Sequence, residues 1–214
     1  ALIDLLLTDS GAQGGTSLYH NLGHGKFEEV TARARLDAKS HAIACTAGDY
    51  DNGGYTDIAI TVNGHVKLFH NEHNGTFKDV TDAAGLAAVD VTRPDRVVSA
   101  GGVATGLNFI DYDHDGDLDL YIVTSSDSSG PPARFDLNEM WRNNGDGKFT
   151  QVTEETGLGF GSGYGAVGTD YNNDRAVDIV VAGSAPGVGS PVSPVIYPNP
   201  REGKFVSHAL IHSQ

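Results

Sequence analysis

Four kinds of strand pattern recur in the same order along the chain. The first is small and rich in glycine (HAIACTAG, GGVATGLNFI and GYGAVGT), as expected for a strand close to a crowded axis. The second is a continuously apolar run (IAI, LYIV and IVV), which is typical of a strand buried on both faces. The third (SLYHN, KLFHN and EMWRN) turns through Asn and Gly into a fourth that alternates polar and apolar residues (FEEVT, FKDVT and FTQVT). This last pair predicts a hairpin whose outer strand is half solvated.

The hairpin segment occurs four times with the same internal spacing. In each copy an Asn stands six residues before a Phe, and a Gly stands two residues before the same Phe; the four asparagines are Asn21, Asn71, Asn143 and Asn199. An Asp before the apolar run repeats with them, at positions 4, 57, 119 and 178, so the units are 53, 62 and 59 residues apart. Repetition at this period, with four antiparallel strands per unit, predicts the blades of a β-propeller.

The predicted fold is an all-β propeller segment that takes up residues 1–214 as a single domain. We expect three complete four-stranded blades, at about 38–82, 97–153 and 160–206, and one partial blade at about 1–31. Known propellers close with about four to eight blades. We therefore expect the segment to belong to a larger ring that missing blades or a second chain complete.

The most distinctive segment is an acidic loop of nine residues, DYDHDGDLD at 111–119. The carboxylates at its places one, three, five and nine are Asp111, Asp113, Asp115 and Asp119. Carboxylates this close repel each other unless a cation lies among them, and oxygen ligands favour Ca²⁺ ahead of Mg²⁺. Gly116 allows the sharp turn, and the backbone carbonyl of Asp117 is the expected ligand at place seven. An EF-hand would need a Glu at place twelve, where this chain has Ile122.

Two further loops keep this frame with changes. The loop at 49–57 has Gly53 in place of the fifth carboxylate, which predicts weaker binding or a water in the gap. Its expected ligands are Asp49, Asp51, the carbonyl of Tyr55 and Asp57. The loop at 170–178 has Arg175 in place of the glycine, where a left-handed backbone is costly for a side chain. Its expected ligands are Asp170, Asn172, Asp174, the carbonyl of Ala176 and Asp178. Two or three calcium sites are therefore predicted.

Charge and composition argue against several other classes of protein. The formal net charge of −14 disfavours nucleic acid and anionic membrane surfaces, which would repel the chain. No segment has the length and apolarity of a membrane span. The sequence has no nucleophile elbow and no phosphate-binding glycine loop, so we expect no enzyme. His70 and His73 lie near a hairpin, but repeat inheritance explains His70 better than a zinc site does, because His20 has the same place in the first unit.

The acidic loop entering an apolar strand, followed by the hairpin segment NNGDGKF, resembles the FG-GAP/VCBS repeat family, whose blades also form integrin α-subunit propellers. The segment MWRNNGDGKFTQVTEETGL is most similar to the bacterial branch, in which these repeats often accompany ASPIC/UnbV-type domains. The resemblance covers nearly the whole chain. It implies a propeller fold, structural calcium, a location that is extracellular, at the cell surface or periplasmic, and a role in binding or adhesion.

Binding is therefore the expected function, as a protein-interaction or adhesion module. The alternative is a carbohydrate-binding propeller, either a lectin or the scaffold of a polysaccharide lyase. A lectin would have equivalent sugar pockets between successive blades. An interaction module would concentrate its contacts on the unequal insertions at 125–138 and 183–194, and this inequality favours the interaction module. The expected partner is a protein or a glycan, bound through these insertion loops.

Overall fold

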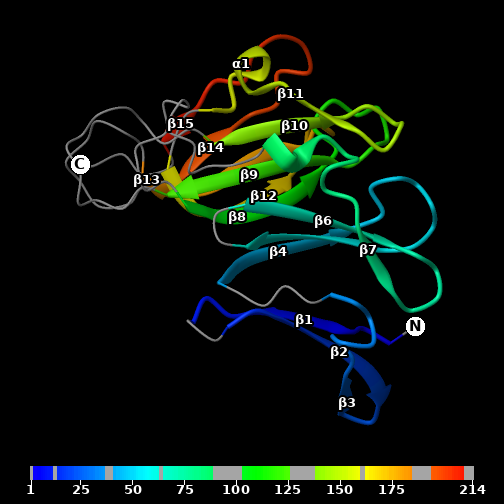
Figure 1. The fold of residues 1–214 in the computed structure, drawn as a ribbon. Coiled ribbons are helices and arrows are strands. Elements are labelled where there is room, and N and C mark those ends of the chain that lie inside the picture. The colour runs from blue at the N-terminus through cyan, green and yellow to red at the C-terminus, as the bar shows by residue number, and fades with distance from the viewer. Residues whose placement is uncertain are drawn as a thin grey trace.

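The computed structural model describes residues 2–11, 14–36, 41–62, 65–88, 103–125, 138–159, 162–184 and 194–209. These residues form four separate antiparallel sheets with only two short helical turns (Figure 1). In every sheet the strands follow one another in chain order, as in a meander. The predicted all-β, propeller-type fold is therefore confirmed, while the exact limits proposed for the blades stay predictions.

The first sheet contains three strands in the described part of the chain: β1 (Leu5–Thr8), β2 (Thr16–Gly23) and β3 (Lys26–Glu29). Because β1 follows Asp4, it corresponds to the second strand of the other sheets. Its exposure differs from theirs, since Leu5 is 43% and Leu7 52% exposed. This sheet is the partial blade that the sequence predicts.

The other three sheets each have four strands, as predicted. The second sheet consists of β4 (Ala42–Gly48), β5 (Asp57–Val62), β6 (His65–Asn71) and β7 (Phe77–Asp79). The third consists of β8 (Val103–Ile110), β9 (Asp119–Ser125), β10 (Glu139–Asn143) and β11 (Phe149–Gln151). The fourth consists of β12 (Ser162–Thr169), β13 (Asp178–Ser184), β14 (Val195–Tyr197) and β15 (His208–Ala209). The helical turns are η1 (Leu86–Ala88) and α1 (Thr153–Thr156).

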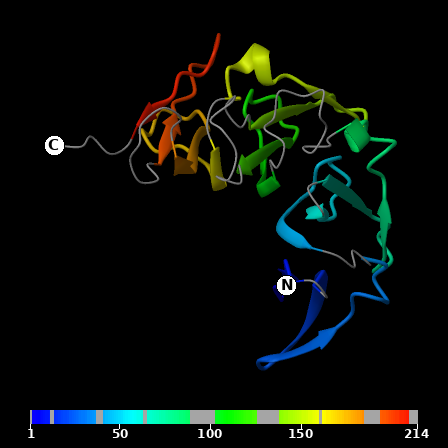
Figure 2. The ribbon, with the colours of Figure 1, turned by 60° about the vertical axis from the view of Figure 1, so that its left-hand side comes forward.

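The four sheets follow one another along an open arc, from the blue N-terminal sheet to the orange C-terminal sheet (Figure 2). The glycine-rich strands form the close contacts between neighbours: β4 lies against β8, and β8 lies against β12. A Cβ atom added to Gly106 in β8 would stand 2.8 Å from the Cα of Gly165 in β12. The absence of side chains therefore allows these strands to approach, as the sequence predicts for a crowded axis.

Apolar side chains fill the spaces between neighbouring blades, so each core belongs to two sheets. Between the second and third blades, the ring of Tyr50 lies 6.5 Å from that of Phe109 and 5.8 Å from that of Phe149, measured between centroids. Between the third and fourth blades, Tyr112 similarly faces Phe205 at 6.3 Å. Burial of these side chains stabilises the packing of neighbouring blades against each other.

The predicted insertions fall largely outside the described residues, which omit 126–137 and 185–193. The described part of the chain contains no helix that is long and apolar enough to cross a membrane.

Candidate metal centre

Each complete blade holds its acidic loop in place through the Asp at place nine. This residue begins the second strand of the blade and is 1% exposed or less in all three copies, Asp57, Asp119 and Asp178. Its Oδ1 accepts a hydrogen bond from the backbone N–H of the hairpin Asn, at 2.7, 2.8 and 2.7 Å respectively. Its Oδ2 accepts from the N–H of the Tyr at place two, at 3.3, 3.2 and 3.2 Å. The loop is thus connected to both its own start and the hairpin.

In the third blade, the loop before β9 brings three carboxylates together. Oxygen atoms of Asp111, Asp113 and Asp115 all lie within 4.8 Å of one another. Oδ1 of Asp111 is buried and has no hydrogen-bond partner. A buried carboxylate oxygen without a donor is costly unless a cation binds it. An all-oxygen donor set with an unpaired buried atom fits a hard divalent cation such as Ca²⁺.

The electrostatics of the third loop also favour a bound cation. Burial raises the pKa of Asp113, and the neighbouring carboxylate of Asp115 adds to this effect. Burial raises the pKa of Asp119 to about 8, even though the amides of Asn143 and Tyr112 donate hydrogen bonds that lower it. Both shifts mean that negative charge is poorly compensated by the protein itself. A cation among these oxygens would supply the missing compensation.

Other predicted residues of the third loop have roles that the sequence did not indicate. Oδ1 of Asp117 accepts a hydrogen bond from the side-chain amide of Asn52 at 2.7 Å, so this side chain joins the loops of neighbouring blades. The role of the Asp117 backbone carbonyl as a ligand stays a prediction. Asp119 lies outside the group of three, and both of its oxygens accept backbone hydrogen bonds. Its role as a ligand stays a prediction.

The second loop is built differently, because the carboxylate at place one is already satisfied. Oδ1 of Asp49 accepts from the N–H of Gly53 and Oδ2 from that of Gly54, both at 2.8 Å. The group that converges here consists of Asp51, Asp57 and His70. The ring of Tyr55 stacks on that of His73, with 3.9 Å between centroids, and the Tyr55 carbonyl stays a predicted ligand. His70, for which the sequence favours repeat inheritance over a zinc site, is thus a candidate ligand here.

The fourth loop is closed in the same manner as the second. Oδ1 and Oδ2 of Asp170 accept hydrogen bonds from the N–H groups of Asp174 and Arg175, both at 2.9 Å. The side-chain amide of Asn172 donates to Oδ2 of Asp174 at 3.0 Å. The guanidinium group of Arg201 donates to the carbonyl oxygen of Asp174 and lies 3.8 Å from its Oδ1. The backbone amides and the Arg201 guanidinium group therefore supply part of the hydrogen bonding and positive charge that a metal ion would supply in the third loop.

The remaining predicted ligands of the fourth loop do not form a converging group in the described structure. Asp178, at place nine, accepts hydrogen bonds from the hairpin Asn and the Tyr at place two, as described above. Ala176 is fully buried, and its N–H donates to Oδ1 of Asp174 at 2.8 Å. Within the described residues, acidic and histidine side chains converge in threes only at the second and third loops. The metal-binding role of all the fourth-loop residues stays a prediction.

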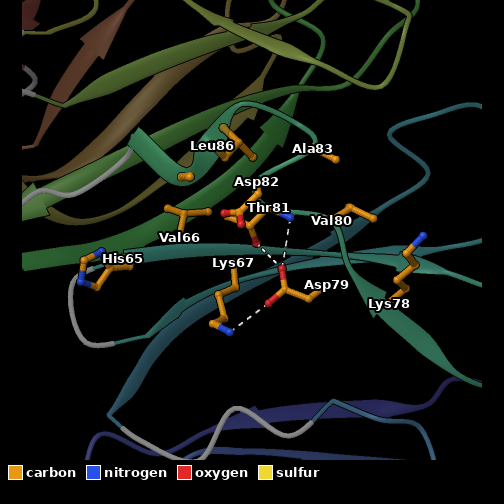
Figure 3. A pocket seen from close by; sticks show the side chains of 11 residues that line it. His65, Val66, Lys67, Lys78, Asp79, Val80, Thr81, Asp82, Ala83 and Leu86 are labelled. Carbon is orange, nitrogen blue, oxygen red and sulfur yellow. Dashed lines mark hydrogen bonds and ion pairs between the residues drawn. The ribbon is translucent and has the colours of Figure 1, made fainter.

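A pocket of about 530 Å³ lies apart from the acidic loops, on the outer part of the second blade (Figure 3). Strands β6 and β7 and the turn η1 form its walls. Val66 and Leu86 contribute buried apolar surface, and Lys67 reaches Oδ2 of Asp79 at 2.9 Å. The pocket therefore has both charged and apolar lining residues, of which Val66 and Leu86 are almost fully covered.

Comparison with known proteins agrees with this architecture. A lectin from Agrocybe aegerita that specifically recognises non-reducing terminal N-acetylglucosamine has a similar solved structure, with a TM-score of 0.50 and 16% identity. The match covers 98% of this chain and 53% of the lectin, so the chain spans about half the length of that protein. At this identity the likeness shows the fold alone. A search of curated protein sequences gave no significant match.

A family model gives the stronger result. The model described as FG-GAP-like repeat matches residues 49–122 and again 111–181, which together make up more than half of the chain. The two matches overlap at the intact third loop, where the carboxylates converge. On this match, and on the repeated loops and sheets described above, the chain belongs to the FG-GAP-like repeat family.

Proposed function

We propose that this chain is a calcium-stabilised propeller module that binds a protein partner outside the cytoplasm, in interaction or adhesion. One observation carries the metal part of the proposal: three carboxylates converge in the third loop around the buried, unpaired Oδ1 of Asp111. Membership of the FG-GAP-like repeat family supports the binding part. Calcium suits this oxygen set, and extracellular modules bind it at about 10⁻⁴ to 10⁻³ M. The net charge of −14 also makes a partner with a basic surface more favourable than an acidic one.

The role of the metal in this proposal is structural. The place-nine carboxylates connect each loop to the hairpin of the same blade, so a cation in the loop would stabilise the packed blade. Binding to the native state alone raises the free energy of unfolding by about 2.7 kcal/mol when the ligand concentration is 100 times the Kd. We therefore expect calcium to govern stability, and the exposed loops to govern recognition.

The test is a calcium titration of the metal-stripped protein by calorimetry, followed by thermal melts with and without Ca²⁺. We expect binding and a higher melting temperature in the wild type. Asp113→Asn should weaken calcium binding at least tenfold, because it removes one charged ligand from the group of three. Glu155→Gln, which removes an exposed charge in α1, should bind calcium as the wild type does.

Two results would reject the metal part of the proposal. One is no binding at millimolar calcium. The other is equal affinity in Asp113→Asn and Glu155→Gln, because calcium would then respond to the overall charge rather than to the loop.

A carbohydrate ligand is the second candidate, as a lectin or a lyase scaffold. The observation behind it is the pocket of Figure 3, which Lys67, Asp79 and Asp82 line together with Val66 and Leu86. This pocket lies on one blade, whereas equivalent pockets between successive blades would be the stronger sign of a lectin. Charged side chains in a concave site can hydrogen-bond sugar hydroxyls. A glycan-array screen of wild type and Lys67→Ala would decide: a glycan hit lost in the variant supports this candidate, and an unchanged or empty array removes it.

A further inference from the structure

The second loop holds a set of donor atoms that differs in chemistry from the set in the third loop. Place five is Gly53, which has no carboxylate, and both oxygens of Asp49 are used by backbone amides. Oδ1 of Asp51 also accepts from the N–H of Gly53, at 2.9 Å. The oxygen cage that calcium prefers, with six to eight ligands, is therefore depleted here.

An imidazole nitrogen takes part in this depleted site. His70, on β6, has its Nδ1 atom 3.1 Å from Oδ2 of Asp51 and 3.3 Å from Oδ1 of Asp57. Nδ1 is buried and makes no hydrogen bond, although both oxygens are close. Asp57 is 1% exposed, whereas the side chains of His70 and Asp51 are 26% and 27% exposed, so the three donor atoms meet at a half-buried position. Both oxygens of Asp57 also accept backbone hydrogen bonds, from Asn71 and Tyr50.

These separations suit a small metal ion. Two ligands bound at about 2.0–2.1 Å are about 2.9–3.4 Å apart when the angle between them is about 90° to 110°. The two distances from Nδ1 of His70 fall in this interval. A donor set of one imidazole and two carboxylates is suited to Zn²⁺ and related transition metals, whereas calcium takes oxygen.

We propose that Asp51, Asp57 and His70 form a transition-metal site, selective for Zn²⁺ over Ca²⁺ and distinct from the calcium site of the third blade. This proposal rests on the proposed function in one respect, namely that the acidic loops bind metals. Three protein ligands leave at least one position of the metal to water. The blades of one chain would then be stabilised by two different metals.

The competing explanation is that His70 is itself the cation. Arg142 stands directly before the hairpin Asn of the third blade, as His70 does in the second, and its charge lowers the pKa of Asp113 against the stronger effect of burial. A protonated His70 would likewise neutralise Asp51 and Asp57 and leave no place for a metal. The two explanations differ in whether the protein binds a transition metal through this nitrogen.

The experiment uses the whole chain with calcium in excess, so that the third loop is filled. Zn²⁺ is titrated by calorimetry, and Co²⁺ is titrated as its spectroscopic substitute, with the visible d–d absorption as the readout. We expect one tight equivalent. His70→Gln should lower the Zn²⁺ affinity at least tenfold, while the calcium titration of the same variant stays unchanged.

Two controls make the result specific. His20→Gln alters the equivalent position in the first blade, where the histidine is 3.1 Å from Asp4 alone, and it should leave Zn²⁺ binding unchanged. Asp113→Asn should weaken calcium binding and keep the Zn²⁺ site. If His70→Gln does not fold, the ring-nitrogen NMR signal of His70 in the wild type, with and without Zn²⁺, replaces it; a large shift of Nδ1 is expected.

Three outcomes would overturn the inference. The first is no Zn²⁺ or Co²⁺ binding, which would leave His70 as an internal cation. The second is equal affinity in the wild type and His70→Gln. The third is loss of Zn²⁺ binding in Asp113→Asn, which would place the transition metal in the third loop. Failure of the calcium proposal is read separately, from the calcium titration of Asp113→Asn.

Discussion

Single residues with left-handed backbone recur at fixed places in each blade. In the acidic loops, place six is Gly54, Gly116 or Arg175, with φ values of 82°, 93° and 71°. Place four is left-handed as well, and its three residues are Asn52, His114 and Asn173. The glycine at place six marks this conformation in the sequence. Asn and His at place four are only enriched in left-handed backbone and are common elsewhere, so they do not by themselves identify the position.

The turn that links one blade to the next also has a residue with left-handed backbone at a fixed place. Arg35, Gly85 and Gly157 have equivalent positions, one residue before a buried Leu, with φ values of 58°, 79° and 75°. A Cβ at Gly157 would lie 2.9 Å from the carbonyl oxygen of Phe205, so the turn is also short of space. Arg35 is the one copy that places a side chain there.

Arg35→Gly should therefore stabilise the protein by about 1 kcal/mol, because the left-handed region costs a residue with a Cβ about 1–2 kcal/mol, partly offset by the entropy of glycine in the unfolded chain. Urea unfolding of the calcium-loaded protein measures the change. Arg35→Ala, which removes the charge and keeps the Cβ, should give no such gain. Equal stability of the two variants would show that backbone strain is not the cause.

At the scale of single elements, the glycine-rich innermost strands decide how closely the blades approach. Gly106 in β8 and Gly165 in β12 face each other across neighbouring sheets, but their surroundings are unequal. A Cβ on Gly106 would meet the backbone of Gly165 at 2.8 Å, whereas a Cβ on Gly165 would meet nothing within 4 Å. Strand composition was readable from the sequence, and this asymmetry was not.

Gly106→Ala should consequently lower the free energy of unfolding by about 1–3 kcal/mol, since overpacking forces the backbone of β12 to shift. Gly165→Ala is the matched substitution on the facing strand and should be close to neutral. Thermal melts of the two variants in calcium provide the comparison. A similar loss in both would indicate a general effect of alanine in these strands rather than the contact between them.

At the scale of the whole molecule, the hairpin asparagines join the blades. The side-chain amide of Asn143 donates to the carbonyl of Tyr50 in the preceding blade at 2.6 Å, and that of Asn199 donates to the carbonyl of Tyr112 at 2.8 Å. The hairpin phenylalanines add a second link, because the N–H of Phe149 donates to the carbonyl of Ala84 at 2.9 Å. The junction of the second and third blades and that of the third and fourth are therefore repeated units of hydrogen bonds and aromatic packing.

Asn143→Ala should lower the free energy of unfolding by about 3 kcal/mol, because it leaves buried carbonyl oxygens without a donor. Asn71→Ala removes the same side chain from a hairpin where the amide donates only to Thr56, within its own blade, and should cost about 1 kcal/mol. Chemical denaturation of both variants measures the difference. Equal losses would mean that the bond between blades contributes little.

The two end blades expose apolar surface whose equivalent in the inner blades is buried against a neighbouring blade. Among the described residues, every large exposed hydrophobic side chain except Tyr55 belongs to the first or the fourth blade; they are Leu2, Ile3, Leu5, Leu7, Leu22, Phe27, Tyr164, Val167, Tyr171 and Val206. Tyr171 has the place of Tyr50 and Tyr112 in its blade but is 52% exposed. Such surface is typical of an interface, which agrees with the expectation that further blades or a second chain complete the ring.

We therefore expect this 214-residue chain to associate, with a solution mass above 22.5 kDa that rises with concentration. Light scattering after size-exclusion chromatography measures it. Tyr171→Ser should reduce the association, and Tyr171→Phe, which keeps the ring, should preserve it. A monomer at every concentration that melts cooperatively would show that the arc is stable alone.

Local patterns by themselves determined the strands, their order and the acidic loops of this protein. These features depend on residues that are close in the sequence: alternating and continuous apolar runs, turn residues and repeated spacing. They can therefore be recognised without knowledge of the tertiary structure. For this reason the four-stranded blades could be predicted. The acidic loop could be identified too, although of its four expected carboxylates Asp111, Asp113 and Asp115 converge and Asp119 does not join them.

Only the tertiary structure decided which of the similar loops leaves carboxylates open to a cation, and which residues from elsewhere approach them. In the second and fourth loops, backbone amides take both oxygens of Asp49 and Asp170, while Oδ1 of Asp111 stays unpaired. His70 comes from a strand beyond the loop, and Asn143 reaches Tyr50, 93 residues away. These contacts depend on the angle between blades and on hydrogen-bond directions, which arise only when the sheets pack and which no local pattern encodes.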